Sequence, residues 1–76
     1  MGYSVESWNF EISKWEHDEN FTNQYNAACH CMAAEPSGRY RLWDEDEIVA
    51  VWDREHRRWV DPSKADPTYP WNTATA

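Results

Sequence analysis

The chain has 76 residues, of which 14 are acidic and 7 are basic, so its formal net charge is −7. This length allows a single domain, and the negative charge disfavours direct binding to nucleic acid phosphates or anionic membranes while favouring a basic protein partner. The two Cys residues are not spaced as in a disulfide framework, so disulfides are not expected to stabilise this small domain. The six Trp, four Tyr and two Phe residues must therefore supply much of the core.

Two segments share one pattern and predict two β-hairpins. Residues 8–15 read WNFEISKW and residues 52–59 read WDREHRRW. Asn and Asp favour turns, and two Trp residues flanking a turn can meet as a cross-strand pair. The first segment also fits an amphipathic helix, because Trp8, Ile12 and Trp15 have helical spacing. We favour a hairpin there by analogy with the second segment, and the helix remains the alternative.

The chain between these segments predicts one helix, over about residues 22–34. Thr22 can cap its start, and the stretch from Ala27 to Ala34 is rich in Ala, the best helix former. Residues 36–38, Pro-Ser-Gly, are expected to end it. The residues expected to form its buried face are Tyr25, Ala28 or Cys29, and Met32.

Three further strands are expected after this helix. Residues 39–43 alternate as a strand, residues 44–47 turn, residues 48–52 return, and a last strand ends at Asp61. The order ββαβββ predicts an α+β domain over residues 1–61, with an antiparallel sheet of about five strands and the helix across one face. Residues 62–76 are expected to be an irregular Pro-rich tail, in which Tyr69-Pro70-Trp71 packs back on the domain.

The expected topology gathers carboxylates at one end of the sheet and most arginines at the other. The acids placed together are Glu16, Asp18, Glu19, Asp44, Glu45, Asp46, Glu47 and Asp61. They have two interpretations: solvated turns that maintain solubility, or a binding surface whose carboxylates stand in for phosphates. Trp43, beside the acids, and Trp71 are candidates for exposed aromatic anchors of such a surface.

Other candidate chemistry is not supported. Cys29 and Cys31 flank His30, but helical residues two apart point to nearly opposite sides and cannot share one tetrahedral metal ion, so we expect Cys29 in the core and Cys31 partly exposed. Residues 44–47 lack the Gly and distal Glu of an EF-hand. No phosphate-binding loop or nucleophile–His pair is present, so we expect no enzyme, no metal and no cofactor. The absence of a signal peptide or apolar span, together with free Cys, predicts the cytoplasm.

In size, acidity and element order, ending at residues 57–61 (Arg-Arg-Trp-Val-Asp), the chain resembles small phage-encoded anti-CRISPR proteins over residues 3–61. Some members of that group act as DNA mimics or occupy the nucleic-acid-binding surface of a Cas effector complex. The resemblance is architectural. It implies an inhibitor in the host cytoplasm that binds a basic Cas effector subunit, and it assigns no residue roles. The alternative is a small structural or assembly protein, monomeric or weakly dimeric, that self-associates through an aromatic face of the sheet.

Overall fold

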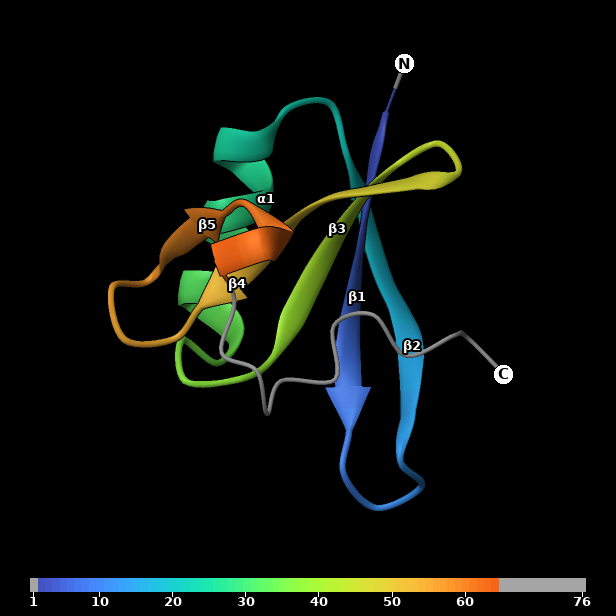
Figure 1. Ribbon diagram of the computed structural model, residues 1–76, viewed down its shortest axis with the longest axis vertical. Helices are drawn as coiled ribbons and strands as arrows, with labels where there is room; N and C mark the ends of the chain where they lie inside the picture. The colour runs from blue at the N-terminus through green and yellow to red at the C-terminus, as the bar shows by residue number, and fades with distance from the viewer. Residues whose placement is uncertain (1, 65–76) are drawn as a thin grey trace.

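The computed structural model describes residues 2–64, which form five strands, one α-helix and a short 3-10 helix. The elements are, in chain order, β1 (Tyr3–Asn9), β2 (Lys14–Phe21), α1 (Gln24–Ala34), β3 (Tyr40–Asp44), β4 (Glu47–Asp53), β5 (Arg58–Val60) and η1 (Pro62–Lys64). The strands form one antiparallel sheet in the order β2-β1-β3-β4-β5, with α1 packed on one face (Figure 1). The predicted α+β fold is confirmed. The predicted contact around Trp71 lies outside the described residues.

Both Trp-containing segments are hairpins, as the repeated pattern predicts. Trp8 is the cross-strand partner of Trp15, and Trp52 is that of Trp59. Their rings pack edge to face, with centroids 5.3 Å apart in the first pair and 5.1 Å in the second. The helical alternative for residues 8–15 is therefore wrong.

The two hairpin turns are built in the same way. The side-chain oxygen of Asn9 accepts a hydrogen bond from the backbone N–H two residues later, and Asp53 does the same in the second turn. Each turn closes on a residue with positive φ, 53° at Ser13 and 57° at Arg57. An Asx residue that starts a turn and a left-handed residue that ends it explain why one sequence pattern gives one structure twice.

The helix begins later than predicted and buries a different face. Asn23, not Thr22, is its N-cap, with its side chain accepting the backbone N–H of Asn26 at 2.8 Å. Its fully buried residues are Ala27 and Cys31, which lie one turn apart. Small side chains at these positions let the helix approach the sheet closely.

The expected buried face of the helix is wrong. Tyr25 is 76% exposed and Met32 is 43% exposed, so both lie on the outer surface. The two cysteines are also exchanged relative to expectation, because Cys29 is exposed and Cys31 is buried. Spacing alone could not separate the two faces, since large apolar residues occupy one and small ones the other.

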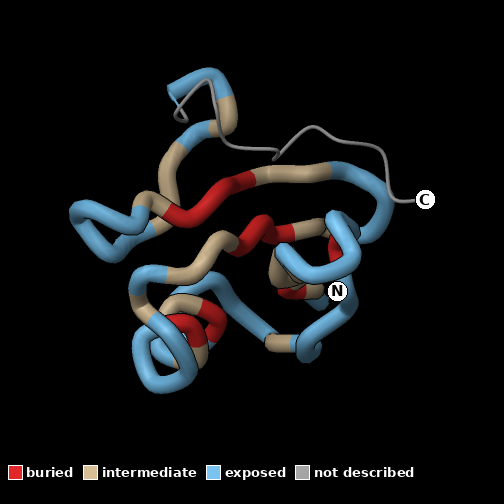
Figure 2. Tube along the Cα trace, turned by 90° about the horizontal axis from the view of Figure 1, so that it is seen from below, coloured by how far each residue is buried: buried red, intermediate tan, exposed pale blue. Residues whose placement is uncertain are grey.

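The main core lies between the sheet and the helix, and Figure 2 shows the buried stretches toward the middle of the molecule with exposed turns around them. Two indoles join the layers. Trp52 donates its Nε1–H to the carbonyl oxygen of Pro36 at 2.9 Å, and Trp59 donates to that of Gln24 at 3.2 Å. The buried residues of this core are Val5, Ala27, Cys31, Tyr40, Leu42, Ala50 and Trp52.

The face of the sheet opposite the helix holds a buried cation. Arg41 is 1% exposed and lies between two indoles, with its guanidinium carbon 4.3 Å from the ring centroid of Trp15 and 5.2 Å from that of Trp43. Its Nε donates to Glu6, which also accepts the indole N–H of Trp43 at 2.6 Å. The charge of Arg41 is thus buried but paired, which avoids most of the cost of an isolated buried ion.

Candidate partner-binding surface

The β3–β4 hairpin presents the most concentrated group of carboxylates in the described chain. Asp44 pairs with Glu47 across the hairpin, and residues 45 and 46 form a two-residue turn in which Glu45 has a φ of 58°. We call residues 44–47 the acidic turn. Glu45, Asp46 and Glu47 are exposed and Asp44 is half-buried. Within residues 2–64, none of these four side chains forms an ion pair.

The three predicted site residues on β2 lie along an edge strand, not at the end of the sheet. The strand continues to Phe21, which pairs with Tyr3 on β1. Tyr3 in turn pairs with Asp44 on β3, so Phe21 and Asp44 lie at the same end of the sheet. Glu16 lies opposite Ser7, and so at the level where β3 begins rather than where it ends. The expected gathering of all eight carboxylates at one end is therefore wrong, because β2 is longer than the sequence indicated.

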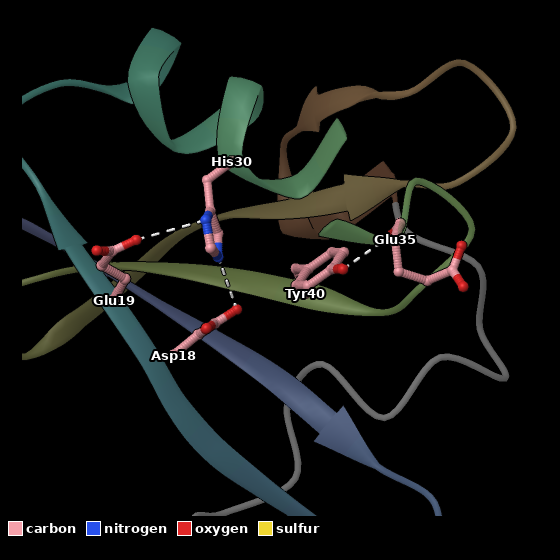
Figure 3. A network of polar contacts seen from close by, with 5 residues as sticks. All are labelled: Asp18, Glu19, His30, Glu35 and Tyr40. Carbon is pink, nitrogen blue, oxygen red and sulfur yellow. Dashed lines mark hydrogen bonds and ion pairs between the residues drawn. The ribbon is translucent and has the colours of Figure 1, made fainter. Parts of the chain in front are cut away.

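Two of the β2 acids face the helix and are already engaged (Figure 3). A register shift in the β1–β2 ladder falls at Asp18, so Asp18 and Glu19 both reach the helix side. The ring of His30 on α1 lies between them, with Nε2 2.9 Å from an Asp18 oxygen and Nδ1 3.4 Å from a Glu19 oxygen. These carboxylates serve to attach the edge strand to the helix. Glu16, the third predicted acid on β2, accepts a hydrogen bond from the side-chain amide of Asn9 at 3.1 Å.

The last predicted acid, Asp61, lies at the other edge of the sheet. It follows β5, whose Val60 pairs with Val51 in the middle of β4. One oxygen of Asp61 accepts hydrogen bonds from the N–H and hydroxyl of Ser63, at 2.9 and 2.7 Å. These bonds lower the pKa of Asp61 below its usual range. Asp61 therefore organises the start of η1 and is remote from the acidic turn.

Trp43 is not an exposed anchor. It is half-buried on the helix-free face, where its indole N–H is bound by Glu6 and its ring flanks Arg41. The other predicted anchor, Trp71, lies outside the described residues. The exposed large apolar side chains are instead in the β1–β2 turn and on the outer side of α1, namely Phe10, Ile12, Tyr25 and Met32.

The basic residues lie at the opposite end of the sheet from the acidic turn, as expected. Arg54 and Arg57 are in the β4–β5 turn, Arg58 begins β5, and Arg39 precedes β3. In Figure 1 the acidic turn is at the upper right and the β4–β5 turn is at the left. Because successive hairpin turns of an antiparallel sheet lie at opposite ends, the charges of these two turns are separated along the strands.

The cysteines and histidines form no candidate catalytic or metal centre within residues 2–64. No three His, Cys, Asp or Glu side chains of that range are grouped to hold a metal ion. Burial raises the pKa of the Cys31 thiol to about 12, with a smaller contribution from the charge of Asp18. Tyr40 behaves similarly, with a pKa raised to about 12 chiefly by burial, and its hydroxyl donates to the carbonyl oxygen of Glu35 (Figure 3). Neither group is ionised near neutral pH.

Two features were missed from the sequence. One is the ion pair between Arg41 and Glu6, which are 35 residues apart in the sequence. A weak signal for it is the position of the charged Arg41 next to Leu42 in an apolar strand. The other is a cavity at the basic end of the sheet, which three separate chain segments form together.

Comparison with known proteins found no match: no protein-family model, no curated protein and no solved structure is similar to this chain. Across residues 2–64, the helix is too short and too polar to cross a membrane.

Proposed function

We propose that the chain is an acidic protein inhibitor that binds the basic nucleic-acid-binding surface of a partner protein, with the acidic turn as the main contact. The observation that carries this proposal is the exposure of Glu45, Asp46 and Glu47 at the end of the sheet away from the arginines, without an ion pair to residues 2–64. Carboxylates in this position can pair with Lys and Arg side chains that would otherwise bind phosphates.

The separation of charge supports this orientation of binding. A basic partner attracts the acidic turn and repels the end of the sheet that carries Arg54, Arg57 and Arg58. Association would then be fast and sensitive to salt, because both charge groups are on the surface. Asp18, Glu19 and Asp61 have structural partners of their own, and Glu16 accepts a hydrogen bond from Asn9, so the acidic turn is the main contact.

The partner that we propose is a subunit of a Cas effector complex in the cytoplasm of a phage-infected host. This part of the proposal rests on the architectural resemblance to anti-CRISPR proteins over residues 3–61. It requires no catalytic group and no cofactor, because occupying the surface is sufficient to block DNA or RNA.

The alternative function, a structural protein that self-associates through an aromatic sheet face, has no comparable support. On the helix-free face, Trp15 is 5% exposed and Trp43 is half-buried. The exposed Phe10 and Tyr25 belong to a turn and to the helix, respectively.

A matched pair of charge reversals tests the proposal. The chain is titrated against a panel of purified Cas effector complexes loaded with guide RNA, in parallel with the variants Asp46→Lys/Glu47→Lys and Glu11→Lys/Glu55→Lys. Both variants change the net charge equally at exposed residues in turns or at a strand start, but only the first alters the acidic turn. We expect the first to weaken binding by at least about thirtyfold, which corresponds to about 2 kcal/mol, and the second by less than about threefold.

Equal weakening by the two variants would show that net charge alone matters and would contradict the role of the acidic turn. Failure of every complex in the panel to bind the unmodified chain would contradict the proposed partner.

A further inference from the structure

A cavity of about 540 Å³ lies at the basic end of the sheet, remote from the acidic turn. It is formed by the loop between α1 and β3, the β4–β5 hairpin and η1. Its size is within the range of small-molecule sites in proteins. The lining residues that matter for its chemistry are Arg39, Arg54, Lys64, Val51, Trp52 and Val60.

The cationic side of the cavity is held in place by the surrounding backbone. Arg54 donates its Nε–H to the carbonyl oxygen of Ser37 at 2.8 Å, which fixes its guanidinium group between the β4–β5 turn and the α1–β3 loop. Lys64 is positioned by the turn of η1, where its backbone N–H binds the carbonyl oxygen of Asp61. Within residues 2–64, neither Arg54 nor Lys64 forms an ion pair, although the charge of Lys64 contributes to the lowered pKa of Asp61, so both cations can contact a bound anion.

Of the two acidic residues of the lining, Asp53 is engaged within its own turn. Asp53 is 2.8 Å from Nδ1 of His56, and its other oxygen accepts the backbone N–H groups of Glu55 and His56. These contacts, the His56 hydrogen bond first, lower the pKa of Asp53, so the carboxylate is ionised and engaged within its own turn. Glu55 is exposed and is the remaining acid of the lining.

An apolar wall completes the cavity. Val51, which is completely buried, and Val60, which is half-buried, pair across β4 and β5 and lie on the same face of the sheet. A planar guanidinium group, an ammonium group and an apolar wall together match a molecule with one anionic group on an apolar body. A bare inorganic ion would use the cations and leave the wall uncovered.

We propose that this cavity binds a small organic anion. The carboxylate or phosphate group of the ligand contacts Arg54 and Lys64, and its apolar part packs against Val51 and Val60. This site is independent of the proposed inhibitory surface, because the two lie at opposite ends of the sheet, so either can fail without the other.

The test uses the full chain, labelled with nitrogen-15, and four probes: phenyl phosphate, benzoate, inorganic phosphate and neutral benzyl alcohol. We expect phenyl phosphate, benzoate or both to shift the Val51 and Val60 amide signals saturably, with a Kd of about 1 mM or lower. Phenyl phosphate alone would identify a phosphate ligand, and benzoate alone a carboxylate ligand. Inorganic phosphate and benzyl alcohol should each bind at least about tenfold more weakly than the best probe.

Two variants that remove the same number of positive charges distinguish the cavity from general attraction to the basic end. Arg54→Gln/Lys64→Gln should weaken binding at least about tenfold, whereas Arg57→Gln/Arg58→Gln, at residues outside the lining, should change it less than about threefold. Unchanged spectra of the folded core will show that the variants are intact. The proposal is overturned if neither organic anion shifts the lining signals, if inorganic phosphate binds equally well, or if the two variants respond alike.

Discussion

Replacing Glu6 with Gln tests whether the buried pair on the helix-free face stabilises the fold as the structure indicates. Gln has almost the same shape as Glu, and its side-chain oxygen can still accept the indole N–H of Trp43, which Glu6 accepts at 2.6 Å. The variant therefore removes mainly the negative charge. Arg41, only 1% exposed, would be left without its described carboxylate partner.

The expected loss is large for a protein of this size. Removing one partner of a buried ion pair costs about 3 to 5 kcal/mol, because the remaining buried charge loses the carboxylate that offsets it. A single core of fewer than 80 residues supplies roughly 3 to 5 kcal/mol in total. Glu6→Gln should thus leave the chain close to its unfolding midpoint at 25 °C, and with an m-value of about 1 kcal/mol/M it should lower the urea midpoint by about 3 to 5 M.

Urea unfolding followed by Trp fluorescence measures this loss, and a second substitution identifies its cause. Arg41→Met keeps an unbranched chain between the two indoles and removes the buried cation. Glu6→Gln/Arg41→Met should therefore be at least about 1 kcal/mol more stable than Glu6→Gln alone. Glu16→Gln, on the exposed β2 edge, is the control and should change stability by less than about 0.5 kcal/mol. A loss below about 1 kcal/mol for Glu6→Gln, or a double variant no more stable than the single one, would refute the reasoning.

Three further predictions concern the thiols, the second hairpin and the loop after the helix. Cys29 should react with a thiol reagent at pH 8 in the folded protein, whereas Cys31, buried and with a pKa of about 12, should react only after unfolding; equal rates would contradict the assigned burial. The folded pKa of Asp53 lies below its usual value, so its contribution to stability is present above about pH 3.9 and is lost as the pH falls through the folded pKa. The stability difference between Asp53→Asn and the unmodified chain should shrink over that acidic range, and a difference that does not shrink would contradict the assigned contacts. Gly38→Ala should destabilise by about 1 to 3 kcal/mol in thermal unfolding, because its added methyl group would lie 3.0 Å from the hydroxyl oxygen of Tyr40; an unchanged melting temperature would show that this ring moves freely.

The element order and the Trp pairs could be predicted because they depend on local patterns. An Asx residue after Trp8 and after Trp52, with a second Trp seven residues beyond the first, specifies turn and register together. The acidic turn was also predictable, since residues 44–47 separate two apolar alternating runs and had to lie at a strand end.

The faces of the elements could not be predicted, because tertiary contacts select them. The helix buries Ala27 and Cys31 since the close approach to the sheet leaves no room for the larger Tyr25 and Met32. The polar run from Glu16 to Asn20 gives no strand signal, yet it pairs with β1 because Trp15 and Phe21 at its ends are held by the sheet. Because β2 extends to Phe21, the predicted site acids Glu16, Asp18 and Glu19 lie along the edge of the sheet and not at its end.

The most direct test of the proposed function is competition between this chain and target DNA for a Cas effector complex that binds the chain. Fluorescence anisotropy of labelled target DNA is recorded while the effector is titrated at several fixed concentrations of the chain. We predict that the apparent Kd for DNA rises in proportion to the chain concentration with an unchanged end point, and that Asp46→Lys/Glu47→Lys removes this effect. A complex that holds the chain and the DNA together, with the DNA affinity unchanged, would contradict the proposal that the acidic turn occupies the nucleic-acid-binding surface.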